Sequence, residues 1–161
     1  LMADVRMTKG GFYKHFDSKD ALYAEALSRA LAEMADRMVA VAESAPPGGQ
    51  VRAIIEAYLS EDHLRNVGEG CVLASLAPEI GRLPSAVRGL VNQAMMAYRA
   101  RISAFLPGRT EAERQAQFGI LYPSMAGVLS TARSLVEPTA QRQMLANARA
   151  FFISQFAPAA G

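Results

Sequence analysis

The sequence is poor in the residues that build disulfides and metal sites. It contains one cysteine, Cys71, and two histidines, His15 and His63. A single cysteine excludes an internal disulfide framework and suits a reducing compartment, so we expect a cytoplasmic protein. The histidines do not have the spacing of metal ligands relative to Cys71. We therefore expect no metal and no other cofactor.

The sequence also lacks long apolar runs and runs of β-branched residues. No stretch of about eighteen or more apolar residues is free of charge, so we expect no membrane span. The chain is 51% hydrophobic and rich in Ala, Leu and Met. These residues favour helices over strands. The composition therefore predicts an all-α protein.

The chain as a whole has little excess of positive over negative charge. The formal net charge of +2 is too small to indicate nucleic-acid binding by itself. Between Arg6 and Lys19, however, four Lys or Arg residues stand against a single acid, Asp17. Taken alone, a short basic run of this kind is more often a solvated helix face than a binding surface.

That basic run, residues 7–19, reads MTKGGFYKHFDSK and has the order of elements of a helix-turn-helix. Thr8 can cap a short helix, and Gly10 and Gly11 leave its first turn bare enough to approach another molecule closely. Phe12 and Phe16 lie four residues apart, on the face expected to point inward. The outer face then carries donors suited to phosphates and base edges, namely Lys9, Tyr13, Lys14 and His15.

This run resembles the TetR family of bacterial transcriptional regulators, which carry the pattern T-x-G-x-F/L-Y-x-H/Y-F-x-S/N-K-x-x-L. The matching positions are Thr8, Gly10, Phe12, Tyr13, His15, Phe16, Ser18, Lys19 and Leu22. The resemblance implies that one group of residues approaches bases or nearby backbone: Thr8, Lys9, Gly10 and Gly11. It implies that a second group binds phosphates: Tyr13, His15 and Lys19. A shorter string, GC-x-L-A-x-L-A-x-E at 70–79, resembles the ligand-binding half of one TetR subgroup.

Two features depart from the TetR pattern. Val5 and Arg6 stand where members of the family commonly have Ala-Gly, so we expect an altered turn between the two short helices. Residues 1–4 resemble the tail of a helix. We therefore expect roughly forty further residues upstream, an estimate based on the resemblance and on typical helix lengths.

Periodicity beyond the motif predicts six helices, at 19–42, 51–64, 71–80, 85–106, 111–136 and 139–156. The Pro- and Gly-rich segment 44–50 separates the first two. The helix at 71–80 is almost wholly apolar and is expected to be buried. We divide the chain into the C-terminal part of a DNA-binding domain with its connector helix, 1–43, and a ligand-binding and dimerisation domain, 44–161.

The last two predicted helices have wide faces of apolar or small residues. The resemblance implies that such helices pair with their copies in a second subunit, so we expect a homodimer formed by 111–136 and 139–156. Met and Tyr side chains between 51 and 136 suit an apolar effector, although each alone is more often a core residue. Candidate ligand-binding residues are Tyr58, His63, Cys71, Met95, Met96, Tyr98, Tyr122 and Met125.

The sequence gives little support for an enzyme. Cys71 and His63 are the only nucleophile and base close together in sequence, and the apolar neighbours of Cys71 suggest a packed hydrophobic side chain. We expect a ligand-responsive DNA-binding regulator, a repressor that a small apolar effector releases from a double-stranded DNA operator. The alternative is a helical small-molecule or thiol-based sensor that does not bind DNA.

Overall fold

The computed structural model describes residues 15–16, 18–68 and 70–157, and these residues form helices joined by turns. No strand occurs among them, so the predicted all-α class is confirmed. None of the helices in this part of the chain is long and apolar enough to cross a membrane.

The longest helix, α2 (Lys19–Glu43), begins where the sequence predicts. The extended backbone of Ser18 places its Oγ 3.0 Å from the amide nitrogen of Ala21, which caps the helix. Buried side chains at Leu27, Leu31, Met34 and Met38 follow the three- and four-residue spacing of an amphipathic helix. One face of α2 therefore packs against the rest of the molecule along most of its length.

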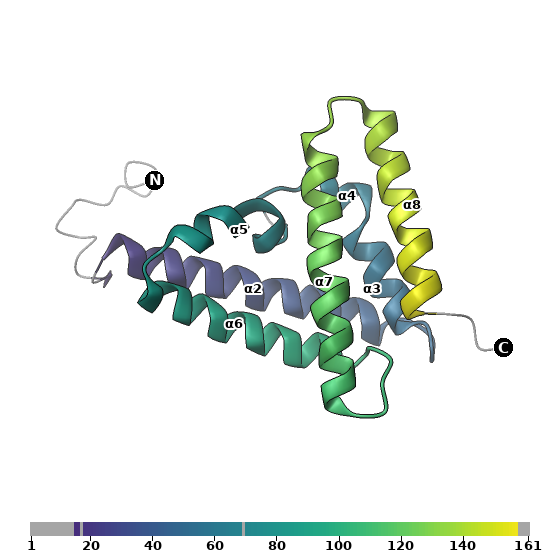
Figure 1. Ribbon diagram of the computed structural model, residues 1–161, viewed down its shortest axis with the longest axis horizontal. Coiled ribbons are helices and arrows are strands. Elements are labelled where there is room, and N and C mark those ends of the chain that lie inside the picture. The colour runs from purple at the N-terminus through teal and green to yellow at the C-terminus, as the bar shows by residue number, and fades with distance from the viewer. Residues whose placement is uncertain (1–14, 17, 69, 158–161) are drawn as a thin grey trace.

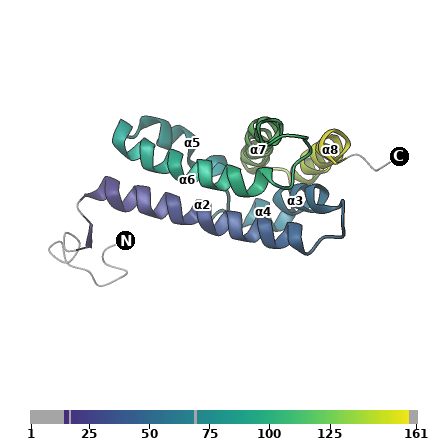
Figure 2. The ribbon, with the colours of Figure 1, turned by 90° about the horizontal axis from the view of Figure 1, so that it is seen from below.

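α2 lies along one edge of the molecule, and the other helices pack against one side of it (Figure 2). α6 (Ser85–Ser103) lies beside α2, and α5 (Val72–Arg82) lies near its N-terminal half (Figures 1 and 2). α7 (Glu111–Ser134) and α8 (Pro138–Phe156) form an antiparallel pair near the C-terminal half of α2 (Figure 1). The N-terminal end of α2 thus projects away from the α7–α8 pair.

The single helix predicted at 51–64 is wrong, because the structure divides this segment into α3 (Gln50–Tyr58) and α4 (Glu61–Arg65). Ser60 has an extended backbone, and its side chain accepts a hydrogen bond from the His63 amide at 3.1 Å. This is an N-cap, which starts a new helix rather than continuing the old one. The two helices meet at a corner formed by Leu59 and Ser60.

The loop before α3 matches the prediction for 44–50. Gly48 has a φ of 80°, a left-handed conformation that glycine adopts without steric cost. The chain therefore reverses after α2 and brings α3 back against it.

Buried side chains form two clusters. The main core joins the C-terminal half of α2 with α3, α6, α7 and α8, and includes Tyr58, Tyr98 and Tyr122. A smaller distal cluster lies between the N-terminal half of α2, α5 and α6, and its buried members are Leu27, Leu31, Val72 and Val91. The full burial predicted for 71–80 is wrong, since only Cys71, Val72 and Ala74 are buried there. Ala77 and Pro78 are exposed and line an open hollow between α5 and the helix at 111–134.

Candidate functional site

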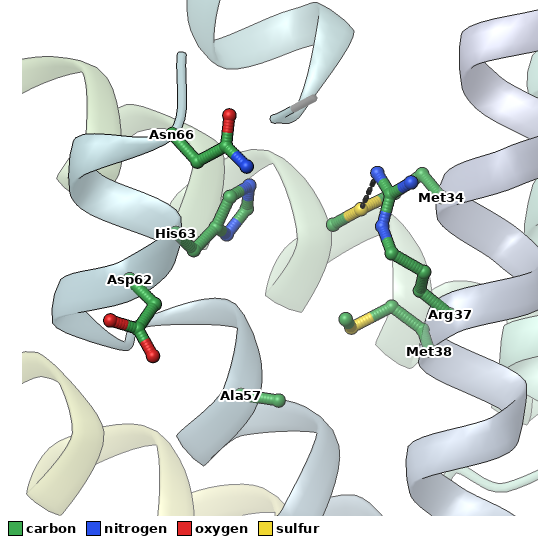
Figure 3. A pocket seen from close by; sticks show the side chains of 7 residues that line it. All are labelled: Met34, Arg37, Met38, Ala57, Asp62, His63 and Asn66. Atoms are coloured by element: carbon green, nitrogen blue, oxygen red, sulfur yellow. Dashed lines mark hydrogen bonds between the residues drawn. The ribbon is translucent and has the colours of Figure 1, made fainter. Parts of the chain in front are cut away.

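A pocket with mixed polar and apolar walls opens between α2 and the α3–α4 corner (Figure 3). We call it the α2–α4 pocket, and its volume is about 200 Å³. One wall comes from α2, and the other from α3, α4 and the residue after α4 (Figure 3). Its lining residues are Met34, Arg37, Met38, Ala57, Asp62, His63 and Asn66.

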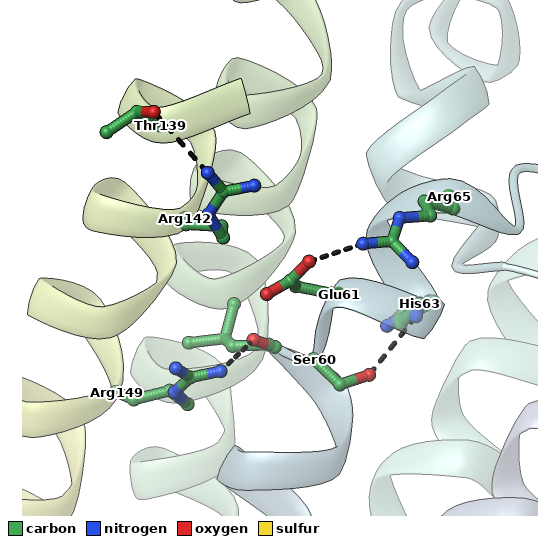
Figure 4. A network of polar contacts seen from close by, with 8 residues as sticks. Ser60, Glu61, His63, Arg65, Thr139, Arg142 and Arg149 are labelled. Carbon is green, nitrogen blue, oxygen red and sulfur yellow. Dashed lines mark hydrogen bonds and ion pairs between the residues drawn. The ribbon is translucent and has the colours of Figure 1, made fainter. Parts of the chain in front are cut away.

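The α3–α4 corner is held from the C-terminal half of the chain. Arg149 of α8 donates a hydrogen bond from Nη1 to the carbonyl oxygen of Leu59 at 2.9 Å, at the end of α3 (Figure 4). An arginine at a helix C-terminus satisfies a carbonyl that the helix leaves free. Within α4, Glu61 pairs with Arg65. The wall of the pocket that contains His63 is therefore fixed in position by α8.

His63 joins this wall to the main core. Its Nδ1 lies 2.6 Å from the carbonyl oxygen of Tyr58, and its Nε2 lies 3.1 Å from the amide nitrogen of Cys71. A backbone N–H can only donate, so Nε2 is the acceptor and the ring proton is on Nδ1. The geometry therefore requires the neutral imidazole, and protonation of Nε2 would remove the acceptor for Cys71.

The electrostatic surroundings of His63 agree with this protonation state. Burial lowers the pKa of His63 from its ordinary value of 6.5. The hydrogen bond to the Tyr58 carbonyl opposes this change, while the positive charges of Arg133 and Arg37 add to it. His63 is thus a structural bridge at neutral pH rather than a cationic ligand group.

Cys71 is the N-cap residue of α5 and is fully buried against the aromatic side chains of the main core. Its Sγ lies 3.1 Å from the hydroxyl oxygen of Tyr122. The ring of Tyr122 stacks on that of Phe118, with 5.1 Å between the ring centroids. The ring centroid of Tyr98 lies 4.8 Å from that of Tyr122. Burial raises the pKa of Tyr122 and of Tyr98, so both hydroxyls stay neutral. The thiol has no solvent access, which argues against direct reactivity.

Tyr58 completes this group of aromatic residues. Its side chain is fully buried, and its ring meets that of Tyr122 edge to face at 5.9 Å. Burial, and then the neighbouring Cys71, raise its pKa. No described residue forms a hydrogen bond of normal geometry with its hydroxyl group.

Arg133 of α7 fixes the segment that connects α4 to α5. It donates to the carbonyl oxygens of Leu64 at 3.1 Å and His63 at 2.7 Å, and to Ser75 Oγ at 3.0 Å. Gly70 lies directly against this guanidinium: an added Cβ would be 2.8 Å from Arg133 Nη2. Because the Arg133 guanidinium approaches the backbone so closely, only glycine fits at position 70 without a shift of its neighbours. Sequence reasoning missed Arg133, although a cation among the apolar and small residues of 121–135 was a signal for it.

The structure brings together five of the predicted ligand-binding residues in the main core: Tyr58, Cys71, Tyr98, Tyr122 and Met125. They pack against one another, and none of them lines the α2–α4 pocket. His63 lines it, whereas Met95 lines a separate hollow between α5 and α6. The side chain of Met96 is 57% exposed. Sequence reasoning did not find Arg37 and Asn66, because the pocket that they line depends on a corner that periodicity did not predict.

Most of the predicted DNA-binding residues lie outside the described residues: Thr8, Lys9, Gly10, Gly11, Tyr13 and Lys14. The remaining two, His15 and Lys19, are exposed. Lys19 is the first residue of α2, directly after the Ser18 cap. The assignment of these eight residues to DNA binding stays a prediction.

No protein-family model matches this chain, and no curated protein matches it.

Proposed function

We propose that this chain is a homodimeric, ligand-responsive transcriptional regulator that binds double-stranded DNA, acting as a repressor that a small effector releases. The observation that carries the proposal is the 7–19 run, in which glycine, aromatic and basic residues have the order found in the TetR family. The Ser18 cap supports it, because the long helix starts at the place that this pattern requires.

The mechanism that we propose uses α2 as the mechanical connection. Its first residue, Lys19, is the last residue of the 7–19 run, and its C-terminal half forms one wall of the α2–α4 pocket and part of the main core. An effector that favours a displaced α2 would change the separation of two recognition helices. A coupling free energy of about 1 to 3 kcal/mol lowers DNA affinity about 5- to 150-fold.

We propose that α7 and α8 form the dimer interface. Ile120 on α7 and Phe151 on α8 are large apolar side chains with exposed fractions of 61% and 60%, which a second subunit would cover. Gly119 and Gly127 have open space where a Cβ would stand, so another helix can approach α7. A twofold dimer would place two recognition helices about 34 to 36 Å apart, the repeat of B-DNA.

The DNA proposal is tested with the full-length protein and the promoter upstream of its own gene. In fluorescence anisotropy, Lys9→Ala is expected to weaken binding and relax base preference, whereas Tyr13→Phe and Lys19→Ala weaken binding to all sequences. Arg52→Gln, an exposed change on α3, is the control. Wild-type affinity in the variants of Lys9, Tyr13 and Lys19 would show that these residues do not contact DNA.

The dimer proposal is tested by sedimentation equilibrium. Phe151→Glu is expected to yield monomers and to weaken operator binding, because it places a charge in the proposed interface. Met96→Glu alters a similarly exposed apolar residue on α6 and should leave the assembly unchanged. A strictly monomeric wild-type protein would contradict the proposal.

A second candidate function is a helical small-molecule or thiol-based sensor that does not bind DNA. The α2–α4 pocket favours the small-molecule form of this candidate, because the pocket lies outside the 7–19 run, whereas the burial of Cys71 argues against the thiol-based form. The anisotropy measurement separates the two candidates, since a sensor of this kind shows no affinity for any duplex.

A further inference from the structure

His63 connects two helix ends through one neutral imidazole ring. Its Nδ1 lies 2.6 Å from the carbonyl oxygen of Tyr58 at the end of α3, and its Nε2 accepts a hydrogen bond from the amide of Cys71 at 3.1 Å. Cys71 is the N-cap residue of α5, and its own side chain does not cap that helix. The ring therefore joins the α3–α4 corner to the start of α5 only while Nε2 carries no proton.

A proton on Nε2 would turn this attraction into repulsion. The protonated ring has an N–H group on each nitrogen, so two donors, Nε2–H and the Cys71 amide, would face each other. Cys71 is fully buried, and a buried donor that loses its acceptor is destabilising. The N-terminus of α5, a helix of 11 residues, also carries the positive end of the helix dipole, which disfavours a cation beside it. Both effects push the first turn of α5 away from a charged His63.

The side chains around the His63 ring contribute more positive than negative charge. The titratable or charged groups that face the ring, or lie beside it on α4, are Arg37 of α2, Tyr58 of α3, Asp62 of α4, Cys71 at the start of α5 and Arg133 of α7. Burial lowers the pKa of His63, the hydrogen bond to the Tyr58 carbonyl opposes this change, and both arginines add to it. The Asp62 carboxylate points away from the ring (Figure 3). A proton therefore binds His63 more tightly once the bridge to Cys71 has opened.

Solvent reaches the ring, and α5 has room to move. His63 is half-buried and lines the α2–α4 pocket, while open hollows lie on the two sides of α5. Two other polar contacts hold the start of α5. Arg133 donates to Ser75 Oγ, and Cys71 Sγ meets the Tyr122 hydroxyl. Neither contact supplies a new acceptor for the Cys71 amide.

We propose that protonation of His63 releases the first turn of α5 from the α3–α4 corner, which makes this ring an acid-sensitive switch. Nε2 takes a proton from solvent, the hydrogen bond from the Cys71 amide is lost, and the start of α5 moves outward. The Cys71 thiol, which is fully buried in the closed form, then becomes accessible to solvent. The switch stands independently of DNA binding, whereas any effect on DNA affinity rests on the proposed function.

The reaction of Cys71 with 4,4′-dithiodipyridine measures this opening, because the chain has no other cysteine. The rate at each pH is divided by the rate for the same chain unfolded in urea, which removes the titration of the thiol itself. Between about pH 7 and pH 5 we expect this ratio to rise about fivefold or more in the wild type. One proton and an ordinary pKa of 6.5 limit the rise to about 25-fold. A ratio that stays constant over this range would overturn the proposal.

Variants of the two histidines assign the effect. In His63→Gln, whose side chain gains no proton in this range, the ratio is expected to be constant with pH. His15→Gln removes the other histidine of the chain, which is exposed, and should keep the rise seen in the wild type. The same rise in His63→Gln as in the wild type would show that another group drives the opening, and the proposal would then be wrong.

Hydrogen exchange of the wild-type protein, resolved by residue with NMR, distinguishes local release from global unfolding. This measurement does not depend on the folding of His63→Gln. After correction for the intrinsic effect of pH, the Cys71 amide is expected to lose protection about five- to 25-fold between about pH 7 and pH 5. The amide of Leu129, in the middle of α7, should keep its protection. Equal losses at the two amides would indicate global unfolding and would refute a local switch.

The regulatory use of the switch is measured separately, by fluorescence anisotropy with the full-length protein and its promoter. Because α5 packs against the N-terminal half of α2, we expect the DNA affinity of the wild type to fall more than that of His63→Gln between about pH 7 and pH 5. Equal falls, with Cys71 exposed in acid, would refute the regulatory use and leave the switch intact. Absence of DNA binding at either pH would refute the proposed function alone.

Discussion

The main core and the distal cluster are built from similar apolar residues but are held together differently. In the main core, polar contacts cross between helices: Arg133 reaches His63 and Leu64, and Cys71 meets Tyr122. The buried side chains of the distal cluster are aliphatic, and open hollows of about 410 and 420 Å³ lie on the two sides of α5. Directional contacts fix the relative positions of helices, whereas aliphatic contacts alone allow them to slide. Arg133 holds the start of α5 through Ser75, so the comparison indicates that the C-terminal part of α5 and the N-terminal half of α2 form the more adjustable region.

Paired Leu→Ala substitutions give the largest expected difference between the two regions. Leu129 is fully buried in the main core, so Leu129→Ala should lower the free energy of unfolding by about 2 to 5 kcal/mol. Leu76 is half-buried beside the distal cluster, and Leu76→Ala should cost about 1 kcal/mol. Urea denaturation measures both. Equal costs would show that the distal cluster is packed as tightly as the main core.

A glycine substitution tests the Arg133 contact that distinguishes the main core. Gly70→Ala places a Cβ 2.8 Å from Arg133 Nη2 and 2.8 Å from the carbonyl oxygen of Asn66, so one of them must shift. We expect a loss of about 1 to 3 kcal/mol in thermal or urea unfolding. Gly68→Ala is the matched control, because no atom lies within 4 Å of its added Cβ. Similar stability of the two variants would mean that the Arg133 side chain and the Asn66 carbonyl move aside at no cost in free energy.

A double-mutant cycle measures the polar pair inside the main core. Tyr122→Phe removes the hydroxyl near Cys71 Sγ and keeps the ring stacked on Phe118, so the expected cost is about 0.5 to 1.5 kcal/mol. In a Cys71→Ala background the same change should cost less, because the partner is already absent. An identical cost in both backgrounds would rule out coupling between the hydroxyl and the thiol.

The pH dependence of stability gives the smallest expected effect. The pKa of His63 is lower in the folded protein than the ordinary value of 6.5, so the unfolded chain binds more protons just below pH 6.5. The contribution of His63 to the free energy of unfolding is therefore complete above pH 6.5, and it decreases as the pH falls from 6.5 to the pKa of His63 in the folded protein. Urea unfolding between about pH 7 and pH 5 should show a steeper loss in wild type than in His63→Gln. Parallel curves would show that His63 does not titrate differently on folding.

The sequence predicted helices well where their ends are set locally. The start of α2 depends on Ser18, and α8 begins at Pro138, whose fixed φ suits a first turn. Both signals lie within a few residues of the end that they determine. The hydrophobic periodicity of 51–64 continues across Leu59 and Ser60, so periodicity alone could not predict the corner between α3 and α4.

The candidate site was predictable only in part. Tyr58, Tyr98 and Tyr122 were found from residue type, and the structure does bring them together, in a packed core. Arg37 and Asn66 come from segments separated by the whole of α3, and only the corner places them on one pocket. A spacing rule along one helix cannot detect such a pair.

The α3–α4 corner also bears on the order in which the chain folds. Arg149 satisfies the carbonyl group of Leu59 at the corner, and Arg133 satisfies that of His63 in α4; these arginines lie 90 and 70 residues further along the chain. Contacts across such separations form late, because a long loop must close first. During synthesis on the ribosome, the α3–α4 corner therefore lacks these stabilising hydrogen bonds until α7 and α8 have emerged.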